Sequence, residues 1–568
     1  RYAENKRAVE DKYMGPLINT IMTRCIQCTR CVRFVTEVAG SPEMGMINRG
    51  EDAEITTYLE SAVTSELSGN VIDLCPVGAL TSKPYSFNAR PWELKKTETI
   101  DVMDAMGSWI RVDARGTGVL RILPRVNDAI NEEWISDKTR FVWDGLQRQR
   151  LDKPYSRVNG NLVPVSWDAA LTIAEDKLGG DPKKIGVVAG DLNSIEELKA
   201  AKDLFDGLGV KSLDCRQDGA KIGGGARAGY LFNSTIEGID TADAILLIGT
   251  NPRLEAPVLN ARIRRAWLER DVPVAMIGED ADLTYPVEHL GTGGKALAGL
   301  GGASKGFAKT LKDAKRPMII VGMGALTGPK GGQVLRAAGE LADKVGAVTD
   351  GWNGFNVLHT AASRVGALDL GFIPGKGGKD VAGMQRAAKK GDLETIVLMG
   401  ADELDMAAFG DAFVIYIGHH GDAGAHRADL ILPGAAYTEK KGMWANTEGR
   451  VQFNARAVFP KGDAKEDWAI FRALSERLGR TLPYDSLEQL RAKLIADHPV
   501  LGEIDHAPGA ESAATFNPAD LGEAGEPGDT PFRNAITDFY QTNAIARASK
   551  TMAECAAMKA DPSAVAAE

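Results

Sequence analysis

The sequence predicts an α/β protein in which parallel sheets, covered by helices on both faces, follow a short cysteine-bearing segment. Three observations support this fold class. The chain has 568 residues, 44% of them hydrophobic, which is enough for three or four domains. Unbroken apolar runs ending in glycine alternate with helical stretches from about residue 155 to 480, as in parallel sheets buried on both faces. Four of the six cysteines fall within residues 25–75.

The clustered cysteines predict one cubane iron–sulfur cluster. Cys25, Cys28 and Cys31 have C-x2-C-x2-C spacing, and Cys75 precedes a proline. This spacing is typical of a loop that wraps a 4Fe–4S cluster, with each thiolate on one iron. A proline after the remote ligand fixes the turn and adds no amide N–H that needs a partner. We therefore predict that Cys25, Cys28, Cys31 and Cys75 bind the metal cluster, and we expect no catalytic residue in this chain.

Two other interpretations of these thiols have less support from the sequence. A zinc site needs two C-x-x-C pairs or histidines, and the first 288 residues contain no histidine. A purely structural thiol group is the other alternative. A second cubane is excluded in this stretch, because no Cys-Pro follows Cys31 closely and no further cysteines precede Cys75.

Nearby Arg24, Arg30 and Arg33 are either surface arginines or charges that favour the reduced cluster. A preference of about 1 kcal/mol would raise its potential by roughly 40 mV.

The next stretch predicts a small β-rich module at residues 97–154. It begins after the Pro/Arg-rich "SKPYSFNARPWELKKTE" and reads as short strands with a turn at Gly116–Gly118. Residues 1–96 before it form the predicted cluster-binding region.

Residues 155–500 form the predicted α/β region. Ser166 is expected to cap a helix with Trp167, Ala170, Ala174 and Leu178 on one face, which stops at Gly179 and Gly180. Strands are expected at "KIGVVAG", "ADAILLIGTNP", "VPVAMIG", "RPMIIVGMG", "TIVLMGAD" and "AFVIYIGHHG". At least two α/β layers are expected, with the Gly/Ala-rich segment 291–306 as the flexible connection between them.

Residues 501–568 turn polar and loose, which predicts an extended arm that wraps a neighbour or is disordered. A short helix with Cys555 is expected at its end. Cys555 and Cys215 are expected to be ordinary small residues without chemistry.

Composition excludes some function classes. A net charge of −10 and a pI near 5.5 argue against a nucleic-acid partner. The chain contains no run of eighteen apolar residues, so no membrane span is predicted. Its charged start does not resemble a signal peptide. The chain opens on Arg1 rather than Met, so we expect further residues upstream.

Other motifs in the α/β region are ambiguous. Gly249 and Asn251 in "GTNP" follow a strand, where a nucleotide can approach its end. No Rossmann fingerprint, Walker A loop or H-E-x-x-H motif is present. His419 and His420, with His426 nearby, lack suitably spaced ligand partners, so the ordinary interpretation is a hydrogen-bonded loop at a strand end.

Longer motifs carry a family resemblance. "ADLILPGAAYTEKKGMWANTEGRVQ" and "GTNP" resemble molybdopterin oxidoreductases of the formate dehydrogenase type. The expected cluster cysteines of the β module and a cysteine that would bind molybdenum are missing, because Cys215 is the only thiol between residues 76 and 554. Together with "TRCIQCTRCVRFVTEVAG", "NEEWISDKTRF" and "GHHGDAGA", these motifs resemble the large iron–sulfur (75 kDa or G) subunit family of respiratory complex I, NADH:quinone oxidoreductase.

The resemblance implies an electron relay that passes single electrons from the NADH/flavin site toward quinone, coupled to proton translocation. It implies that the four cysteines bind one 4Fe–4S cluster, and that another 4Fe–4S and a 2Fe–2S cluster lie further upstream. The molybdopterin-like region would be silent and hold no molybdopterin. Implied partners are the flavin/NADH-binding subunit and the quinone-proximal iron–sulfur subunits, with no nucleic acid. The implied location is peripheral, on the cytoplasmic side of a bacterial inner membrane or the matrix side of the mitochondrial one.

Two competing functions remain. A self-contained molybdopterin enzyme of the formate dehydrogenase type requires molybdenum or tungsten plus pterin. A hydrogenase-like enzyme needs further active-site cysteines in the C-terminal half, where Cys555 stands alone.

Overall fold

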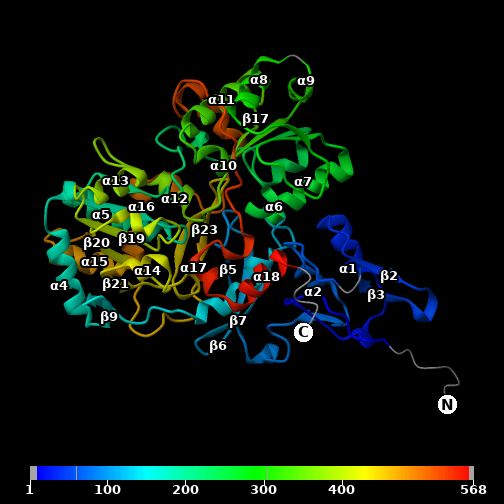
Figure 1. Ribbon diagram of the computed structural model, residues 1–568, viewed down its shortest axis with the longest axis horizontal. Helices are drawn as coiled ribbons and strands as arrows, with labels where there is room; N and C mark the ends of the chain where they lie inside the picture. The colour runs from blue at the N-terminus through cyan, green and yellow to red at the C-terminus, as the bar shows by residue number, and fades with distance from the viewer. Residues whose placement is uncertain (1–8, 59–60, 304, 562–568) are drawn as a thin grey trace.

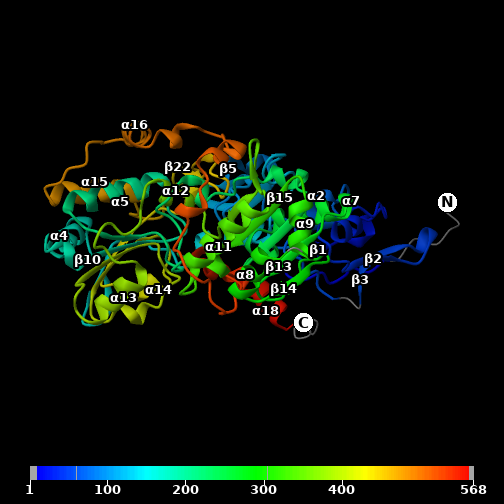
Figure 2. The ribbon, with the colours of Figure 1, turned by 90° about the horizontal axis from the view of Figure 1, so that it is seen from above.

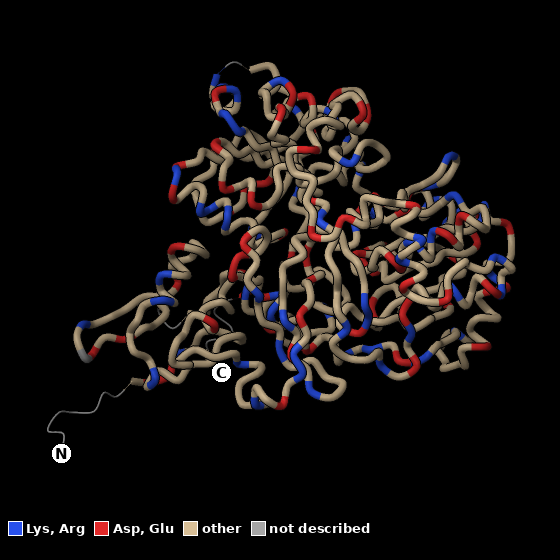
Figure 3. The backbone as a smooth tube through the Cα atoms, turned by 180° about the vertical axis from the view of Figure 1, so that it is seen from behind, with Lys and Arg blue, Asp and Glu red and all other residues tan. Residues whose placement is uncertain are grey.

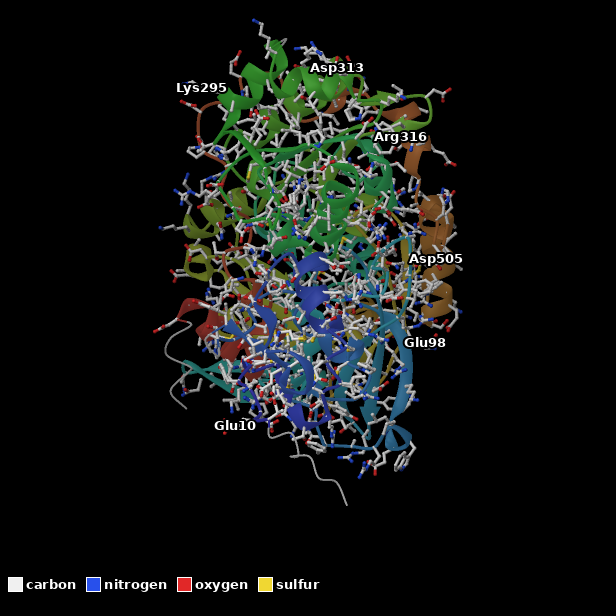
Figure 4. All side chains as sticks on the ribbon, turned by 90° about the vertical axis from the view of Figure 1, so that its right-hand side faces the viewer. Glu10, Glu98, Lys295, Asp313, Arg316 and Asp505 are labelled. Atoms are coloured by element: carbon white, nitrogen blue, oxygen red, sulfur yellow. The ribbon has the colours of Figure 1, made fainter. Side chains whose placement is uncertain are left out.

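The structure, a computed structural model, describes residues 9–58, 61–303 and 305–561 (Figure 1). The beginning of the predicted cluster-binding region, residues 1–8, and the last residues of the predicted arm, 562–568, lie outside this range. The cysteine-bearing segment forms one end of the molecule, and the two α/β units form the rest (Figure 1). Lys295 and Asp313 mark the end formed by the second α/β unit, whereas Glu10 lies at the opposite end (Figure 4).

The larger sheet has seven strands in the order β11–β10–β19–β20–β21–β8–β9. Its strands are β8 (Tyr155–Val158), β9 (Asn161–Pro164), β10 (Ile185–Ala189), β11 (Ser212–Asp214), β19 (Thr395–Met399), β20 (Phe413–Gly418) and β21 (Leu430–Pro433). The first five in this order pair in parallel, and β8 and β9 add an antiparallel edge. Every residue of β10 and β19 is buried, as expected for parallel strands covered on both faces.

The second sheet has five parallel strands in the order β14–β13–β12–β15–β18. They are β12 (Ala244–Ile248), β13 (Val274–Ile277), β14 (Glu288–Gly291), β15 (Pro317–Gly322) and β18 (Phe355–Leu358). Leu246 and Ile248 belong to one hydrophobic core, and Ile245 and Leu247 to another. Both faces are therefore buried. All six strands that the sequence predicts are confirmed, three in each sheet.

Helices cover both sheets. The main ones are α4 (Trp167–Leu178), α5 (Ile195–Leu208), α13 (Val381–Lys389), α14 (Ala423–Arg427), α15 (Asp467–Arg477) and α16 (Leu487–Asp497) beside the seven strands, and α6 (Pro252–Glu255), α7 (Pro257–Arg270), α8 (Gly294–Gly302), α9 (Phe307–Asp313), α10 (Met323–Leu326) and α11 (Gly331–Lys344) beside the five. The helix α12 (Arg364–Asp369) follows β18. Figure 2 shows α5, α15 and α16 on one side of the larger sheet, with α13 and α14 on the other.

The predicted connection at 291–306 is wrong. Residues Gly294–Gly302 form α8, which lies between β14 and β15 of one sheet. Leu297 is 1% exposed, so burial of the apolar side stabilises a helix despite its glycines. The five-stranded unit is instead inserted into the other: β8 to β11 precede it and β19 to β21 follow it.

The predicted β-rich module is a three-stranded antiparallel sheet. It contains β5 (Lys95–Ile100), β6 (Trp109–Arg115) and β7 (Gly118–Pro124), with Gly116 at φ +61° in the turn. Before it, β1 (Ile18–Thr20) pairs with β4 (Leu80–Ser82), and β2 (Met44–Ile47) forms a hairpin with β3 (Glu54–Thr57). Short two-stranded sheets β16 (Val348–Thr349)–β17 (Trp352–Asn353) and β22 (Gly442–Ala445)–β23 (Val451–Asn454) complete the strands of the described residues.

The arm after residue 500 lies along this same chain. Glu523 N–H donates to Gly332 O (3.1 Å) and Phe532 N–H to Thr292 O (2.7 Å). Two helices, α17 (Ala544–Ala548) and α18 (Lys550–Ala560), end the described chain, which confirms the terminal helix with Cys555. Among the described residues, no helix combines the length and hydropathy needed to cross a membrane. Acidic and basic residues are interspersed along the backbone (Figure 3).

Candidate metal centre

Two loops that are distant in sequence meet through a short antiparallel ladder. Thr20 of β1 pairs with Leu80 of β4, and Ile21 N–H donates to Ala79 O (2.8 Å). This ladder ends where the chain enters the first cysteine loop and leaves the second. It therefore fixes the distance between the loop that carries three cysteines and the loop that carries the fourth.

The first loop winds tightly around its three thiols. A 3-10 turn at Met22–Arg24 ends at Cys25, and Gln27 and Thr29 adopt φ +48° and +59°. Left-handed residues between cysteines reverse the chain direction over a short distance. The helix α1 (Arg30–Arg33) then presents Cys31. Gln27 Nε2 donates to Ala53 O (3.1 Å), which ties the loop to the start of β3.

The second loop presents one thiol at a helix end. The helix α2 (Asn70–Leu74) stops at Cys75, whose backbone is extended (φ −74°, ψ 107°). An extended residue before Pro76 is what the proline ring requires. Gly78 at φ +63° completes the turn into β4.

The four thiols line one pocket. Its walls include the apolar side chains of Met22, Ile55 and Leu80, all buried. Two backbone N–H groups donate to sulfur at 3.4 Å, from Gln27 to Cys25 Sγ and from Leu80 to Cys75 Sγ. The pocket thus combines four sulfur ligands, apolar walls and amide donors aimed at sulfur.

The pKa of the Cys31 thiol shows that negative charge in this pocket is unfavourable unless a cation balances it. Burial is the main cause that raises the pKa of the Cys31 thiol to about 11, and the neighbouring Cys25, Cys28 and Cys75 contribute to this shift. Four ionised thiolates in one pocket would therefore need cations between them, and the irons of a cluster would supply that charge.

The arrangement of the possible metal ligands argues against a single zinc ion. Zinc–thiolate bonds of about 2.3 Å place the sulfurs about 3.8 Å apart. In the part of the chain that the structure describes, no group of three or more Cys, His, Asp or Glu side chains is arranged to hold a single metal ion. Thiolates that each bind a different iron of a cluster are held further apart, so the pocket fits a cluster.

The remaining thiols and the paired histidines lie elsewhere. Cys215 and Cys555 are buried, at 1% and 0% exposure, and burial raises the pKa of Cys215 to about 12. His420 Nε2 lies 2.9 Å from Gly145 O, and its Nδ1 lies 2.5 Å from that of His419. Burial lowers the pKa of both rings. The hydrogen-bonded loop at the end of β20 is confirmed.

Gly249 has a structural use. Its φ is +56°, and an added Cβ would lie 2.5 Å from the backbone N of Ala325. The space at the end of β12 is therefore filled by α10 rather than left open to a nucleotide.

Sequence reasoning missed a polar cavity between the two α/β units. Asp191, Gln217, Asp218 and Glu403 line it, and each follows a parallel strand, in "VVAGD", "LDCRQD" or "MGADE". Ligands of open α/β sheets bind at the carboxyl ends of strands, so acidic residues at these positions were the available signal.

Comparisons with known proteins agree with this architecture. The family model described as "Molybdopterin oxidoreductase" matches residues 150–477. The ferredoxin-like domain of "NADH-quinone oxidoreductase subunit 3" matches residues 15–81. The "NADH-ubiquinone oxidoreductase NDSU1/NuoG-like, 4Fe-4S domain" matches 94–144, and the C-terminal model of the NADH-ubiquinone oxidoreductase G subunit matches 506–555. The structure is similar to acetylene hydratase from Pelobacter acetylenicus, with a TM-score of 0.53 and 12% identity over 79% of each chain, which shows the fold alone.

These matches define an iron–sulfur protein built on the molybdopterin oxidoreductase fold. Among relatives, the "NADH-ubiquinone oxidoreductase 78 kDa subunit, mitochondrial" of Neurospora crassa is 50% identical over 98% of this chain and 75% of its own length. "NADH dehydrogenase [ubiquinone] iron-sulfur protein 1, mitochondrial" of Solanum tuberosum is 47% identical over 98% and 74%, and the G subunit of NADH-quinone oxidoreductase from Rickettsia bellii is 46% identical over 99% and 80%. The chain belongs to the family of the 78 kDa or G subunit of NADH:ubiquinone oxidoreductase, respiratory complex I. The resemblance read from the sequence is confirmed, and the likeness to molybdopterin enzymes is one of fold.

Proposed function

We propose that this chain is an electron relay of NADH:quinone oxidoreductase, and that Cys25, Cys28, Cys31 and Cys75 bind one 4Fe–4S cluster in it. The observation that carries the proposal is that the β1–β4 ladder brings the thiols of two separate loops to one pocket. A bound cluster supplies one-electron transfer on the way from NADH to quinone, in an enzyme that also translocates protons.

The chain's own residues would set the properties of this centre. The buried side chains of Met22, Ile55 and Leu80 keep water from one side of the pocket. The N–H groups of Gln27 and Leu80 donate to ligand sulfurs. Hydrogen bonds to the sulfurs raise the reduction potential because they stabilise the more negative, reduced state.

We propose that the partners are the flavin/NADH-binding subunit and the quinone-proximal iron–sulfur subunits. Support comes from exposed apolar side chains in the cysteine-bearing part of the chain. Of the thirteen large apolar side chains exposed in the described residues, six lie between residues 26 and 92: Ile26, Met46, Ile47, Tyr58, Phe87 and Trp92. Nearly half of the exposed large apolar side chains thus lie in this short part of the chain, and apolar side chains that gather on a surface favour contact with a partner protein. The same arrangement would attach the chain to the membrane through the complex, on the cytoplasmic side in a bacterium or the matrix side in a mitochondrion.

We also propose that the α/β region binds no molybdopterin and has no catalytic residue. The cavity between its two units is lined partly by residues 535–547 of the arm and by no cysteine. The family's further 4Fe–4S and 2Fe–2S clusters would need ligands from outside these 568 residues, because only two cysteines remain beside the four of the pocket.

Replacement of Cys75 by alanine tests the proposal. We expect the variant to lose one cubane signal in low-temperature EPR of the reduced protein, together with the iron and sulfide of one cluster. Cys215→Ala removes a buried thiol outside the pocket and should keep the signal. Persistence of the signal in Cys75→Ala would overturn the ligand assignment, and molybdenum with pterin in the purified protein would overturn the absence of molybdopterin.

A further inference from the structure

The polar cavity between the two α/β units shares no lining residue with the cysteine pocket. It has a volume of about 240 Å³ and is lined by loops that follow β10, β11, β18 and β19 and by residues of the C-terminal arm. Carboxyl ends of parallel strands from both sheets thus converge on one cavity, which is where open α/β sheets bind ligands. Thr537 and Asp538 of its lining are exposed, so the cavity is reached from solvent beside the arm.

Part of the polar lining is already satisfied within the protein. Glu403 accepts hydrogen bonds from Arg547 (2.6 Å) and from Gln217 Nε2 (2.7 Å). Asp218 Oδ1 accepts one from the buried Arg364 (3.0 Å). These contacts fix the orientation of the Gln217 amide, since its nitrogen must face the Glu403 carboxylate.

Two acceptors remain without a donor. Oδ1 of Asp191 and Oε1 of Gln217 are buried atoms with no hydrogen-bond partner among the described residues. Gln217 is only 5% exposed and lines the cavity with Asp191. A buried acceptor without a donor costs about 1–3 kcal/mol, so a ligand that donates to both would recover that cost.

The charges around the cavity favour a cation. Asp191 lies near the carboxylates of Glu403 and Asp218, and burial with the Glu403 charge raises its pKa to about 7. The cations of the lining are engaged elsewhere: Arg547 also binds Asp422 (2.6 Å), and Lys138 donates to Thr542 and is near Asp101 and Asp104. Arg364, a buried cation outside the lining, lowers the pKa of Asp191, but it is paired with Asp218. The carboxylates of Asp191, Asp218 and Glu403 therefore outnumber the two arginines that act on them.

We propose that this cavity binds a small organic cation, a primary ammonium or guanidinium compound, whose N–H groups donate to Asp191 Oδ1 and Gln217 Oε1. A metal ion fits less well, because no group of acidic, His or Cys side chains in the described ranges is arranged to hold one. The volume lies below the roughly 300–1,000 Å³ of sites for drug-sized ligands, which favours a ligand smaller than these. This site is independent of the cysteine pocket.

Calorimetric titration of the purified full chain tests the proposal. The probes are methylammonium and methylguanidinium chloride, at concentrations far below denaturing ones. Tetramethylammonium chloride is the control, because it carries the charge but donates no N–H. We expect saturable one-to-one binding of at least one of the two donating cations and none of the control. Absence of binding by both, or equal binding of tetramethylammonium, would overturn the proposal.

Two variants place the binding in this cavity. Asp191→Asn removes the charge while keeping the shape, and should weaken binding at least tenfold. Asp392→Asn, at an exposed position, should leave it unchanged. Hydrogen exchange of the unmodified protein gives a second readout, because bound probe should slow exchange in residues 535–547. Unchanged affinity in Asp191→Asn, or unchanged exchange in that segment at saturating probe, would contradict the assignment.

Discussion

Three arginines surround the cysteine pocket, and their exposure decides how strongly they act on it. Arg24, Arg30 and Arg33 all face solvent, where water and salt screen their charge. If Cys31 binds the cluster, the neighbouring Arg30 still favours its more negative, reduced state. We therefore predict that Arg30→Gln lowers the midpoint potential, but by less than the roughly 40 mV that corresponds to 1 kcal/mol.

An EPR-monitored redox titration at low ionic strength measures this shift. Arg480→Gln, a change at an exposed position in another part of the chain, is the control and should leave the potential unchanged. A rise in potential for Arg30→Gln would contradict the sign of the electrostatic argument.

At Gly249 the absence of a side chain is a packing requirement. The left-handed backbone and the approach of Ala325 to 2.5 Å of an added Cβ both penalise any other residue. We predict that Gly249→Ala lowers the free energy of unfolding by more than about 2 kcal/mol, of which the backbone conformation contributes about 1–2 kcal/mol. Denaturant unfolding measures the change.

Gly299→Ala is the matched control. Gly299 lies inside α8, and no atom lies within 4 Å of its added Cβ. Alanine there should stabilise the protein by about 0.5–1 kcal/mol. An equal effect of both changes would show that the contact with α10 is unimportant.

Among single residues, the sequence most readily predicts site residues that lie close together along the chain. Cys25, Cys28 and Cys31 are recognised because the loop geometry is encoded within seven positions. Asp191, Gln217 and Glu403 were not recognised, because their proximity depends on the order of strands in the sheet and not on sequence distance.

Among single elements, α4 shows how far local signals determine a helix. Ser166 Oγ accepts from Ala169 N–H, and Ala170, Ala174 and Leu178 are buried, as the sequence predicts. We predict that Ser166→Ala destabilises α4 by about 1 kcal/mol, because an N–H of the first turn loses its acceptor. Hydrogen exchange of the amides in the first turn measures the effect, and Ser166→Asp should retain the protection. Equal protection in all three proteins would contradict a capping role.

The elements that sequence reasoning missed or misplaced were decided by tertiary contacts. The strands β11, β14, β18 and β21 have three or four residues each, too few for a pattern to stand out. Pairing of β10 with β19 joins Val187 to Val397, across the whole inserted unit. The division at 1–96, 97–154, 155–500 and 501–568 stays a prediction, although family models match ranges close to it.

For the whole molecule, the C-terminal arm connects parts that the sequence could not bring together. Ser549 and Thr551 hydrogen-bond to Asp144, which follows the strands of the β module, and Lys559 pairs with Glu66 of the predicted cluster-binding region. Arg253 of α6 also binds Glu66 (2.8 Å). A polar, glycine-rich segment has the composition of disorder, yet backbone and ionic contacts with its own chain order it. Contacts of this kind leave no periodic signal.

Buried carboxyls throughout the chain predict how its stability depends on pH. Burial raises the pKa of Asp101 and Asp467 to about 8 and that of Asp137 to about 7, against about 3.9 in an unfolded chain. Between these values the folded chain holds protons that the unfolded chain has lost, so stability falls as pH rises. His359 has the opposite effect on stability, because burial lowers its pKa to about 4. This effect is confined to pH values below about 6.5, the pKa of histidine in an unfolded chain.

The window from pH 6.5 to 8 therefore isolates the carboxyls, and we predict that the melting temperature falls across it. Each carboxyl that is protonated only in the folded state contributes up to about 1.4 kcal/mol per pH unit. Asp101→Asn and Asp467→Asn should flatten the dependence, because asparagine keeps the shape and cannot lose a proton. Asp392→Asn, on the surface, should leave the slope unchanged. Calorimetry at several pH values gives the slope. A melting temperature that rises from pH 6.5 to 8 would mean that these carboxyls are ionised in the folded protein, and that cations outside the chain neutralise them.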